Sequence, residues 1–373
     1  MFSCSIKSQI ELWNKPDVNL STLTAVNSEN DKGRAFLSFL RANNVQFKTV
    51  AKNLTYLIEM QKQQPLRGFR ASNSFSTFHH SYHNFEDIIT TFSSWCQQYR
   101  DVCKLMKIGK THENRPILAA TIEKENSNQK KSVLIECGIH AREWIAPAIC
   151  MCIFQTLLQN QQNLEHHTFH MVPLLNPDGY AFSWRSQRLW RKNRRVNARN
   201  PRCSGVDLNR NFDINFCRVG ASKDACSEVY CGPFAFSEPE SKALRNFILN
   251  TAKPYATFHI HSYGQLIIHP HGYTRRKPPN AKNLNALAKR AVKNIKRNRG
   301  RSYKSGQTSS ILYLSSGGAD DWAFAKAKAS LSYTIEGRDN GNYGFMLPQN
   351  QILPACTEVW IAISTILSEN KNS

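Results

Sequence analysis

Apolar positions along most of the chain fall into two repeating patterns, which predict strands and helices. Strand-like apolar runs cover residues 116–122, 132–139, 168–175, 255–262, 265–270 and 331–336. Helical apolar spacing covers residues 85–99, 146–159, 238–250, 281–298 and 352–367. Because the two patterns alternate, the chain predicts an α/β domain with a largely buried sheet. Active sites of such sheets lie beyond the carboxyl ends of strands, so residues directly after the strands are the candidates for chemistry.

The first part of the chain has a different pattern. Its apolar spacing predicts a helix, a strand and a helix over residues 34–44, 45–50 and 53–63. The segment 63–84 is rich in serine, basic and turn-forming residues and predicts an exposed linker. Arg67 and Arg70 lie in this linker, where a trypsin-like protease could cut the chain.

Length and composition limit the possible classes of protein. The chain has 373 residues, enough for one large domain and a small one, and 41% are hydrophobic, so a core can form. No run approaches the ~18 consecutive apolar residues of a membrane span, and none is expected. The start, MFSCSIKSQIELW, lacks the apolar stretch of a signal peptide.

Cysteine usage nevertheless indicates an oxidising compartment. The sequence holds 11 cysteines, a high count for a cytosolic enzyme. Four crowd residues 203–231 without CxxC pairs, which favours disulfides over a zinc ribbon. Two glycosylation sequons, at Asn19 and Asn53, agree with secretion. We therefore expect an extracellular or secreted protein.

The net charge of +22 points to anionic partners. Lys and Arg cluster in residues 184–202 and between Arg275 and Lys304. Such clusters attract polyanions such as heparin-like glycosaminoglycans or nucleic acid. A solvated basic face is an equally good explanation, and no pattern typical of a nucleic-acid-binding motif is present.

His140 and Glu143 directly follow the 132–139 strand, three residues apart, so both can reach one metal ion. A surface ion pair is the alternative for this common spacing. A third ligand is offered by His259 or His261. His261 is favoured because it lies where the strand gives way to Ser-Tyr-Gly, whereas His259 reads as a core histidine. A His2Glu set leaves one coordination position open for water, as hydrolytic zinc sites require.

Further residues supply what such a site needs. Glu336 ends the 331–336 strand and is the candidate base, although a salt bridge to an arginine is the alternative. Asn209 and Arg210 form a candidate carboxylate clamp, because a guanidinium binds a carboxylate bidentately. Asp207 is a candidate to orient a metal-bound histidine.

The motifs HAREW, LLNPDGY, RLWRKNR, DLNRNF, HSYGQ, LYLSSGGADDW and TIEGRDNGNYGF occur in one order along the chain. Together they resemble the zinc metallocarboxypeptidases of the pancreatic A/B type, from about residue 75 to 370. The resemblance implies a mixed, mostly parallel sheet flanked by helices, in a catalytic domain over 71–373. Residues 1–70 resemble the latter half of the family's inhibitory α+β propeptide with its linker; the leader and the first propeptide strand and helix have no counterpart.

The resemblance also implies the chemistry of the site. His140, Glu143 and His261 resemble the ligands of one Zn²⁺ per chain. Glu336 looks like the general base and acid. Arg191 looks like the residue that polarises the scissile carbonyl.

The substrate contacts implied by the resemblance lie around this centre. Asn209, Arg210 and Tyr313 look like the clamp on the free C-terminal carboxylate. Arg142 and Arg188 resemble secondary substrate-contacting arginines. The implied partners are peptides or proteins with free C-termini and an activating trypsin-like protease, and a monomer is expected.

The family's disulfide separations imply three bridges, namely Cys137–Cys150, Cys203–Cys226 and Cys217–Cys231. Cys4, Cys96, Cys103, Cys152 and Cys356 are left over. Cys96 and Cys103 either pair or remain free buried thiols.

Asp320 falls where the family's B-type members carry a pocket-floor Asp, which implies a preference for C-terminal Arg or Lys. Two alternatives stay open: an A-type enzyme preferring apolar residues, and a polyanion-binding protein without peptidase activity. The chain departs from the family pattern at Gly337, Asn342, His269 and His271.

Overall fold

The computed structural model describes residues 10–12, 24–26, 31–45, 54–62, 75–124 and 130–369. The chain divides into two compact units, Met1–Leu54 and Thr55–Ser373. In the first unit, β1 (Ile10–Leu12) pairs antiparallel with β2 (Thr24–Val26), and α1 (Asp31–Ala42) follows.

Several predictions for the first part of the chain fall outside the described residues. These are most of the 45–50 strand, Cys4, both sequons, Arg67 and Arg70. The predicted helix over 53–63 is α2 (Leu54–Lys62), which lies almost wholly within the second unit. The boundary at residue 70 between propeptide and catalytic domain stays a prediction, because it rests on a processing site.

The second unit contains a mixed eight-stranded sheet. In spatial order its strands are β3 (Cys103–Lys110), β4 (Pro116–Ile122), β6 (His167–Val172), β5 (Lys131–Cys137), β7 (Ala256–His261), β10 (Leu331–Glu336), β8 (Leu266–His269) and β9 (Lys304–Gln307). The four central strands, β6, β5, β7 and β10, are parallel to one another. Antiparallel pairs join β3 to β4, β4 to β6 and β10 to β8. The predicted mixed sheet with a parallel centre is confirmed.

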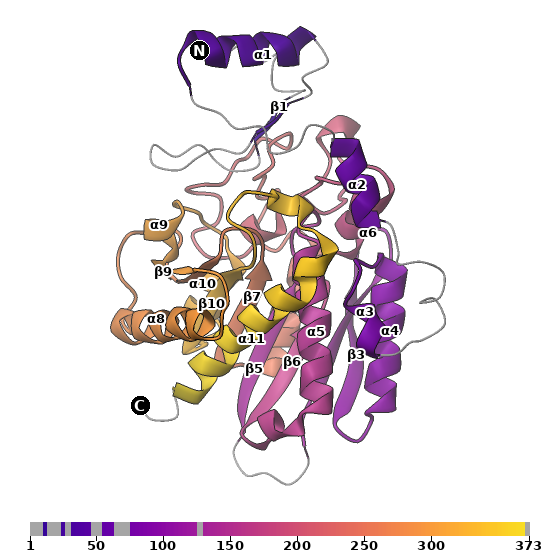
Figure 1. Ribbon diagram of the computed structural model, residues 1–373, viewed down its shortest axis with the longest axis vertical. Coiled ribbons are helices and arrows are strands. Elements are labelled where there is room, and N and C mark those ends of the chain that lie inside the picture. Colours follow the sequence, from indigo (N-terminus) through magenta and orange to yellow (C-terminus); the bar gives the residue numbers. More distant parts are fainter. Residues whose placement is uncertain are drawn as a thin grey trace. The chain divides into compact units, whose positions relative to one another are not determined.

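Besides α2, the α-helices of this unit are α3 (Phe75–Phe78), α4 (Phe85–Gln98), α5 (Ile145–Gln159), α6 (Pro177–Arg185), α7 (Pro239–Phe247), α8 (Ala281–Arg297), α9 (Thr308–Ile311), α10 (Ala319–Ala325) and α11 (Ile352–Glu369). The helices cover both faces of the sheet because its central strands are apolar on both faces. In β4, Ile117 and Ala119 join one core, whereas Leu118 and Ala120 join the other. The larger core is covered by α4, α5, α8 and α11, and α11 contacts both α5 and α8 (Figure 1). The smaller core is covered by α7 and α10.

Helix α11 is long and apolar. By length and composition the helical stretch Gln349–Ser368 is apolar enough to cross a membrane, but 56% of that window is buried inside the protein. Its burial against α5 and α8 is typical of a core helix.

Four disulfides occur within the described residues. Two of the implied bridges are present, Cys203–Cys226 and Cys217–Cys231. Cys96 pairs with Cys103, and Cys152 of α5 pairs with Cys356 of α11.

The implied Cys137–Cys150 bridge is absent, because both cysteines are free buried thiols. The Cys150 thiol instead lies 3.9 Å from the carbonyl oxygen of Val172, a weak hydrogen bond. Burial and the neighbouring Cys150 raise the pKa of Cys137 well above its usual range, so its thiol stays protonated. Here the two residues pack as small apolar groups.

Candidate metal centre and substrate clamp

The turn after β5 carries two of the three candidate ligands. Gly138 has a φ of +70°, and a Cβ on it would come 2.6 Å from Leu174 Cδ1, so the turn requires glycine. His140 and Glu143 follow between β5 and α5. Strand β7 lies beside β5 and ends at His261, which brings the third candidate ligand to the same edge.

The candidate ligand atoms converge on Glu143. Its Oε1 lies 2.8 Å from His140 Nδ1, and its Oε2 lies 3.0 Å from His261 Nδ1. All three side chains are buried, and their ligand atoms lie within 4.8 Å of one another. Burial would raise the pKa of Glu143, but the two imidazoles outweigh burial and lower it. Burial would lower the pKa of His261, but Glu143 raises it to about 9. A metal ion binding here would therefore compete with protons for the imidazole nitrogens.

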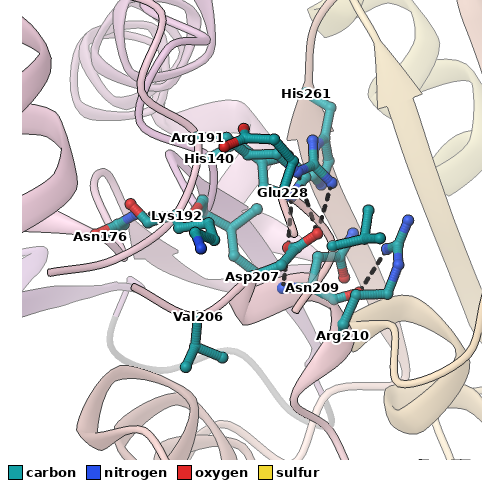
Figure 2. A network of polar contacts seen from close by, with 12 residues as sticks. His140, Asn176, Arg191, Lys192, Val206, Asp207, Asn209, Arg210, Glu228 and His261 are labelled. Atoms are coloured by element: carbon teal, nitrogen blue, oxygen red, sulfur yellow. Dashed lines mark hydrogen bonds and ion pairs between the residues drawn. The ribbon is translucent and has the colours of Figure 1, made fainter. Parts of the chain in front are cut away.

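Asp207 lies at the centre of the polar network in Figure 2. Its Oδ1 lies 3.1 Å from His140 Nε2 and accepts a hydrogen bond from the backbone N–H of Asn209 at 3.0 Å. Its Oδ2 accepts from Arg191 Nε at 3.1 Å and from Nη2 at 2.9 Å. Burial would raise the pKa of Asp207, but Arg191 and other cations hold it well below its usual range. A carboxylate at His140 Nε2 keeps the proton on that nitrogen and leaves Nδ1 for a metal.

Glu336 ends β10, whose parallel pairing with β7 places it opposite His261. The sequence placed both residues at strand ends, and the sheet brings these two ends side by side. Burial raises the pKa of Glu336 to about 8, and the charge of Glu143 acts in the same direction. A carboxylate with a pKa near neutrality can both accept and return a proton.

The predicted clamp residues are held by backbone contacts. Arg210 is buried, with Nη1 donating to the Asn209 carbonyl at 2.7 Å and Nε to another backbone carbonyl at 2.9 Å. Asn209 Oδ1 accepts from the backbone N–H of Ala319 at 2.9 Å, which ties the clamp to α10. Tyr313 lies in the loop before α10, within electrostatic range of Arg191.

Asp320 and Asp321 open α10, and their surroundings differ. Asp321 accepts hydrogen bonds from the backbone N–H of Gly272, at 2.9 Å to Oδ2. No hydrogen bond from the described residues reaches the carboxylate of Asp320, although its side chain is mostly buried. Burial lowers the pKa of His269 and of His271, and the charge of Asp320 opposes that shift. The carboxylate of Asp320 is thus buried, and its charge acts on both imidazoles.

Both predicted secondary arginines have partners. Arg142 lies 3.6 Å from Glu228 and over the ring of Phe345, 4.5 Å from its centroid. Arg188 donates to Gln61 Oε1 at 3.0 Å and to the Phe345 carbonyl at 2.6 Å. Burial lowers the pKa of Arg188 to about 9. Sequence reasoning missed Gln61, Glu228 and Phe345, because partners this far apart in the chain leave no spacing pattern.

The fold and this arrangement agree with a class of protein, the metal-dependent hydrolases. The model of one protein family, described as zinc carboxypeptidase, matches residues 88–362. The chain belongs to this zinc-dependent family and is a metallocarboxypeptidase.

Individual relatives agree with this assignment. Carboxypeptidase A6 of Mus musculus is 34% identical over 372 residues, which is 96% of this chain and 84% of the relative. Carboxypeptidase B of Bos taurus is 38% identical over 344 residues, 88% of this chain and 79% of the relative. The crystal structure of thrombin activatable fibrinolysis inhibitor superimposes with a TM-score of 0.89 at 33% identity, covering 97% of this chain and 92% of the other. Relatives named for the A and B types both match, so the comparisons leave the choice of C-terminal residue open.

Proposed function

We propose that the chain removes single residues from free peptide C-termini, with a preference for Arg and Lys, using zinc held by His140, Glu143 and His261. The observation that carries this proposal is that three ligand atoms within 4.8 Å of one another lie beside Glu336, which is opposite His261 across the β7–β10 pair. Two imidazole nitrogens and one carboxylate fit zinc, because hydrolytic zinc sites use this donor set and keep a fourth position open.

Each residue has a stated task in the reaction. Bound zinc would supply Lewis-acid chemistry and lower the pKa of water. Glu336 takes a proton from the attacking water and passes it to the leaving amine. Arg191 donates to the scissile carbonyl oxygen as negative charge develops there. Arg210 and Asn209 hold the terminal carboxylate, which restricts cleavage to the last residue.

The role of Glu336 is tested by Glu336→Gln, which preserves shape but cannot accept the proton. We expect this variant to retain zinc and lose most turnover of a peptide ending in Arg. Glu86→Gln, an exposed change on α4, is the matched control and should keep both. Near-normal kcat in a zinc-loaded Glu336→Gln protein would remove the role assigned to Glu336.

Asp320 supports the preference for basic residues. Its carboxylate is mostly buried yet receives no hydrogen bond from the described residues, so a guanidinium or ammonium group could pair with it. An apolar C-terminal side chain would instead leave this carboxylate desolvated without a partner. The pocket would then favour Arg and Lys over Phe and Leu.

The preference is tested with three peptides that differ only in a C-terminal Arg, Phe or Glu. The wild type should have its highest kcat/KM for Arg, and Asp320→Ile should shift the preference toward Phe. Asp101→Asn removes an exposed carboxylate elsewhere and should leave the preference unchanged. A wild type that cleaves Phe faster than Arg would exclude the basic preference and leave the carboxypeptidase activity standing.

We also propose that the protein is secreted, monomeric and processed by a trypsin-like protease after Arg67 or Arg70. Four disulfides within the described residues support an oxidising compartment. Limited trypsin digestion followed by N-terminal sequencing tests the processing sites. A first cleavage elsewhere would contradict them.

Charge on α8 supports a heparin-like polyanion as an additional partner. Between Glu240 and Asp320 the sequence contains no acidic residue. The apolar face of α8 is buried in the larger core, whereas Lys289, Lys293 and Lys296 are exposed at helical spacing. Three cations along one helix face suit a linear sulfated chain.

Heparin affinity at increasing salt tests this surface. Replacing Lys289, Lys293 and Lys296 together by Ala should lower the salt concentration needed for elution. The matched control removes three exposed lysines of β3, Lys104, Lys107 and Lys110. Equal shifts in both triple variants would show general charge attraction and exclude a specific α8 surface.

A further inference from the structure

A second cluster of metal-ligating side chains lies outside the candidate zinc centre. His112 belongs to the turn between β3 and β4, Glu238 caps the start of α7, and Glu240 lies in the first turn of that helix. One ligand atom from each lies within 4.8 Å of the other two. His112 Nε2 is 2.8 Å from Glu238 Oε2, so these atoms share a proton in the metal-free arrangement. The family resemblance assigned no role to any of the three.

Glu238 is fixed by surrounding donors. Its Oε1 accepts from Ser237 Oγ at 2.6 Å and from Arg195 Nη1 at 2.9 Å. Its Oε2 also accepts from Asn193 Nδ2 at 2.8 Å. Burial would raise the pKa of Glu238, but hydrogen bonds, that from His112 foremost, bring it to about 2. Such outer partners orient a carboxylate toward a metal ion.

The buried carboxylate of Glu240 has an oxygen without a partner among the described residues, which points to a cation that binds here. Its side chain is fully buried, and its Oε1 accepts no hydrogen bond within the described part of the chain. Its Oε2 accepts a hydrogen bond from Asn193 at 3.0 Å. Burial raises the pKa of Glu240 to about 7. A buried carboxylate oxygen without a partner is costly, unless a proton or a cation neutralises it.

The charges around the cluster balance only when the cluster binds an extra proton. Two buried carboxylates face one guanidinium, that of Arg195, whose side chain is itself 36% exposed. The hydrogen bond to Glu238 raises the pKa of His112, so His112 can carry this proton. A divalent ion replacing the shared proton would supply positive charge and give the open Glu240 oxygen a bond.

We propose that His112, Glu238 and Glu240 form a second binding site for a divalent transition-metal ion such as Zn²⁺. One imidazole nitrogen and two carboxylate oxygens suit the borderline ions of the zinc type, and the fourth position is open to water. The His112 side chain is 30% exposed, which gives the ion a path from solvent. The ion would join the β3–β4 turn to the start of α7.

Zinc content and thermal stability of the full chain test the proposal, with Zn²⁺ as the probe. With free Zn²⁺ buffered at the lowest concentration that gives the wild type two ions per chain, His112→Gln should hold close to one. His166→Gln, an exposed histidine elsewhere, should still hold two. Loss of the His112 ligand should weaken the binding of the second Zn²⁺ by at least about tenfold. Changing a residue that only orients a metal ligand already weakens metal binding by about 10–100-fold. Added Zn²⁺ should raise the Tm of a zinc-preloaded wild type more than that of His112→Gln.

A second pair of variants keeps the test independent of the candidate catalytic centre. In the His140→Ala background one ion should remain, and adding His112→Gln should remove it. Glu240→Gln should act like His112→Gln; if it fails to fold, the exposed His112 variants still decide the outcome. One ion in the wild type, or equal zinc content in wild type and His112→Gln, would show that the cluster binds only a proton and overturn the proposal.

Discussion

Asp207→Asn should weaken zinc binding, because Asp207 holds His140 and Arg191 at once. The buried carboxylate makes four hydrogen-bond contacts, with His140 Nε2, the Asn209 N–H and two Arg191 nitrogens. An amide has the same shape but only one acceptor oxygen. If its NH2 group faces Arg191, the N–H groups of the amide point at the N–H groups of the buried guanidinium, and no acceptor lies between them. If it faces His140 Nε2, that nitrogen must become the acceptor and the ring proton moves to Nδ1, where the metal should bind.

In either orientation the amide breaks one contact, with Arg191 or with His140, and zinc affinity should fall. Changing a residue that orients a metal ligand weakens metal binding by about 10–100-fold. This corresponds to about 1.4–2.7 kcal/mol in binding free energy. Turnover should fall further than zinc affinity, because Arg191 also loses its orientation next to the scissile carbonyl.

Zinc competition against a chromogenic chelator measures the effect. Asp178→Asn is the matched control, since Asp178 is equally buried and accepts from Thr111 Oγ1 at 2.6 Å and from Arg115 Nη1 at 2.7 Å without touching a candidate zinc ligand. The control should lose stability but keep the zinc Kd of the wild type. A folded Asp207→Asn protein with the zinc affinity of the wild type would refute the reasoning.

Three further outcomes are expected. Arg210→Ala should raise KM for free-acid peptides, since a charge-assisted hydrogen bond contributes about 1.5–3 kcal/mol, and equal losses on acid and amide substrates would exclude the clamp. Burial lowers the pKa of His170 from 6.5 to about 4, so the unfolded chain takes up the proton first as pH falls and stability drops between pH 6.5 and 4. The loss should reach about 3 kcal/mol, and urea midpoints of His170→Gln should fall less over this range; parallel curves would contradict this. Replacing Cys152 and Cys356 by Ser opens a bridge between residues 204 positions apart and should lower stability by about 2–4 kcal/mol, whereas an unchanged Tm would show that α5–α11 packing suffices.

The main features of the sheet could be predicted from the sequence where local pattern and burial agree. Strand β10 occupies the predicted residues 331–336, because its apolar run ends at a charged residue. Strand β3 was missed: its pattern places Lys104, Lys107 and Lys110 on an exposed edge, so it lacks an apolar run. Strand β9 was missed because it has only four residues and a Gly at its third position.

The candidate metal centre was found by one physical rule, that parallel strands end at the same edge of a sheet. His261 and Glu336 were chosen as strand-end residues, and the β7–β10 register places them opposite each other. No comparable rule predicts from the sequence which distant segments come into contact. The link from Gln61 to Arg188 depends on where α2 docks, and the Cys152–Cys356 bridge on how α11 crosses α5. The family's disulfide separations implied a bridge at Cys137, which is instead a free thiol in the core.

The most direct test of the central claim uses one peptide ending in Arg and its C-terminally amidated twin, with products read by mass spectrometry. The trypsin-treated protein should release a single Arg from the free-acid peptide and leave the amide essentially intact. Removing zinc with phenanthroline should abolish the release, and adding Zn²⁺ back should restore it. Internal cleavage, equal cleavage of the amide, or activity that survives complete zinc removal would contradict the claim.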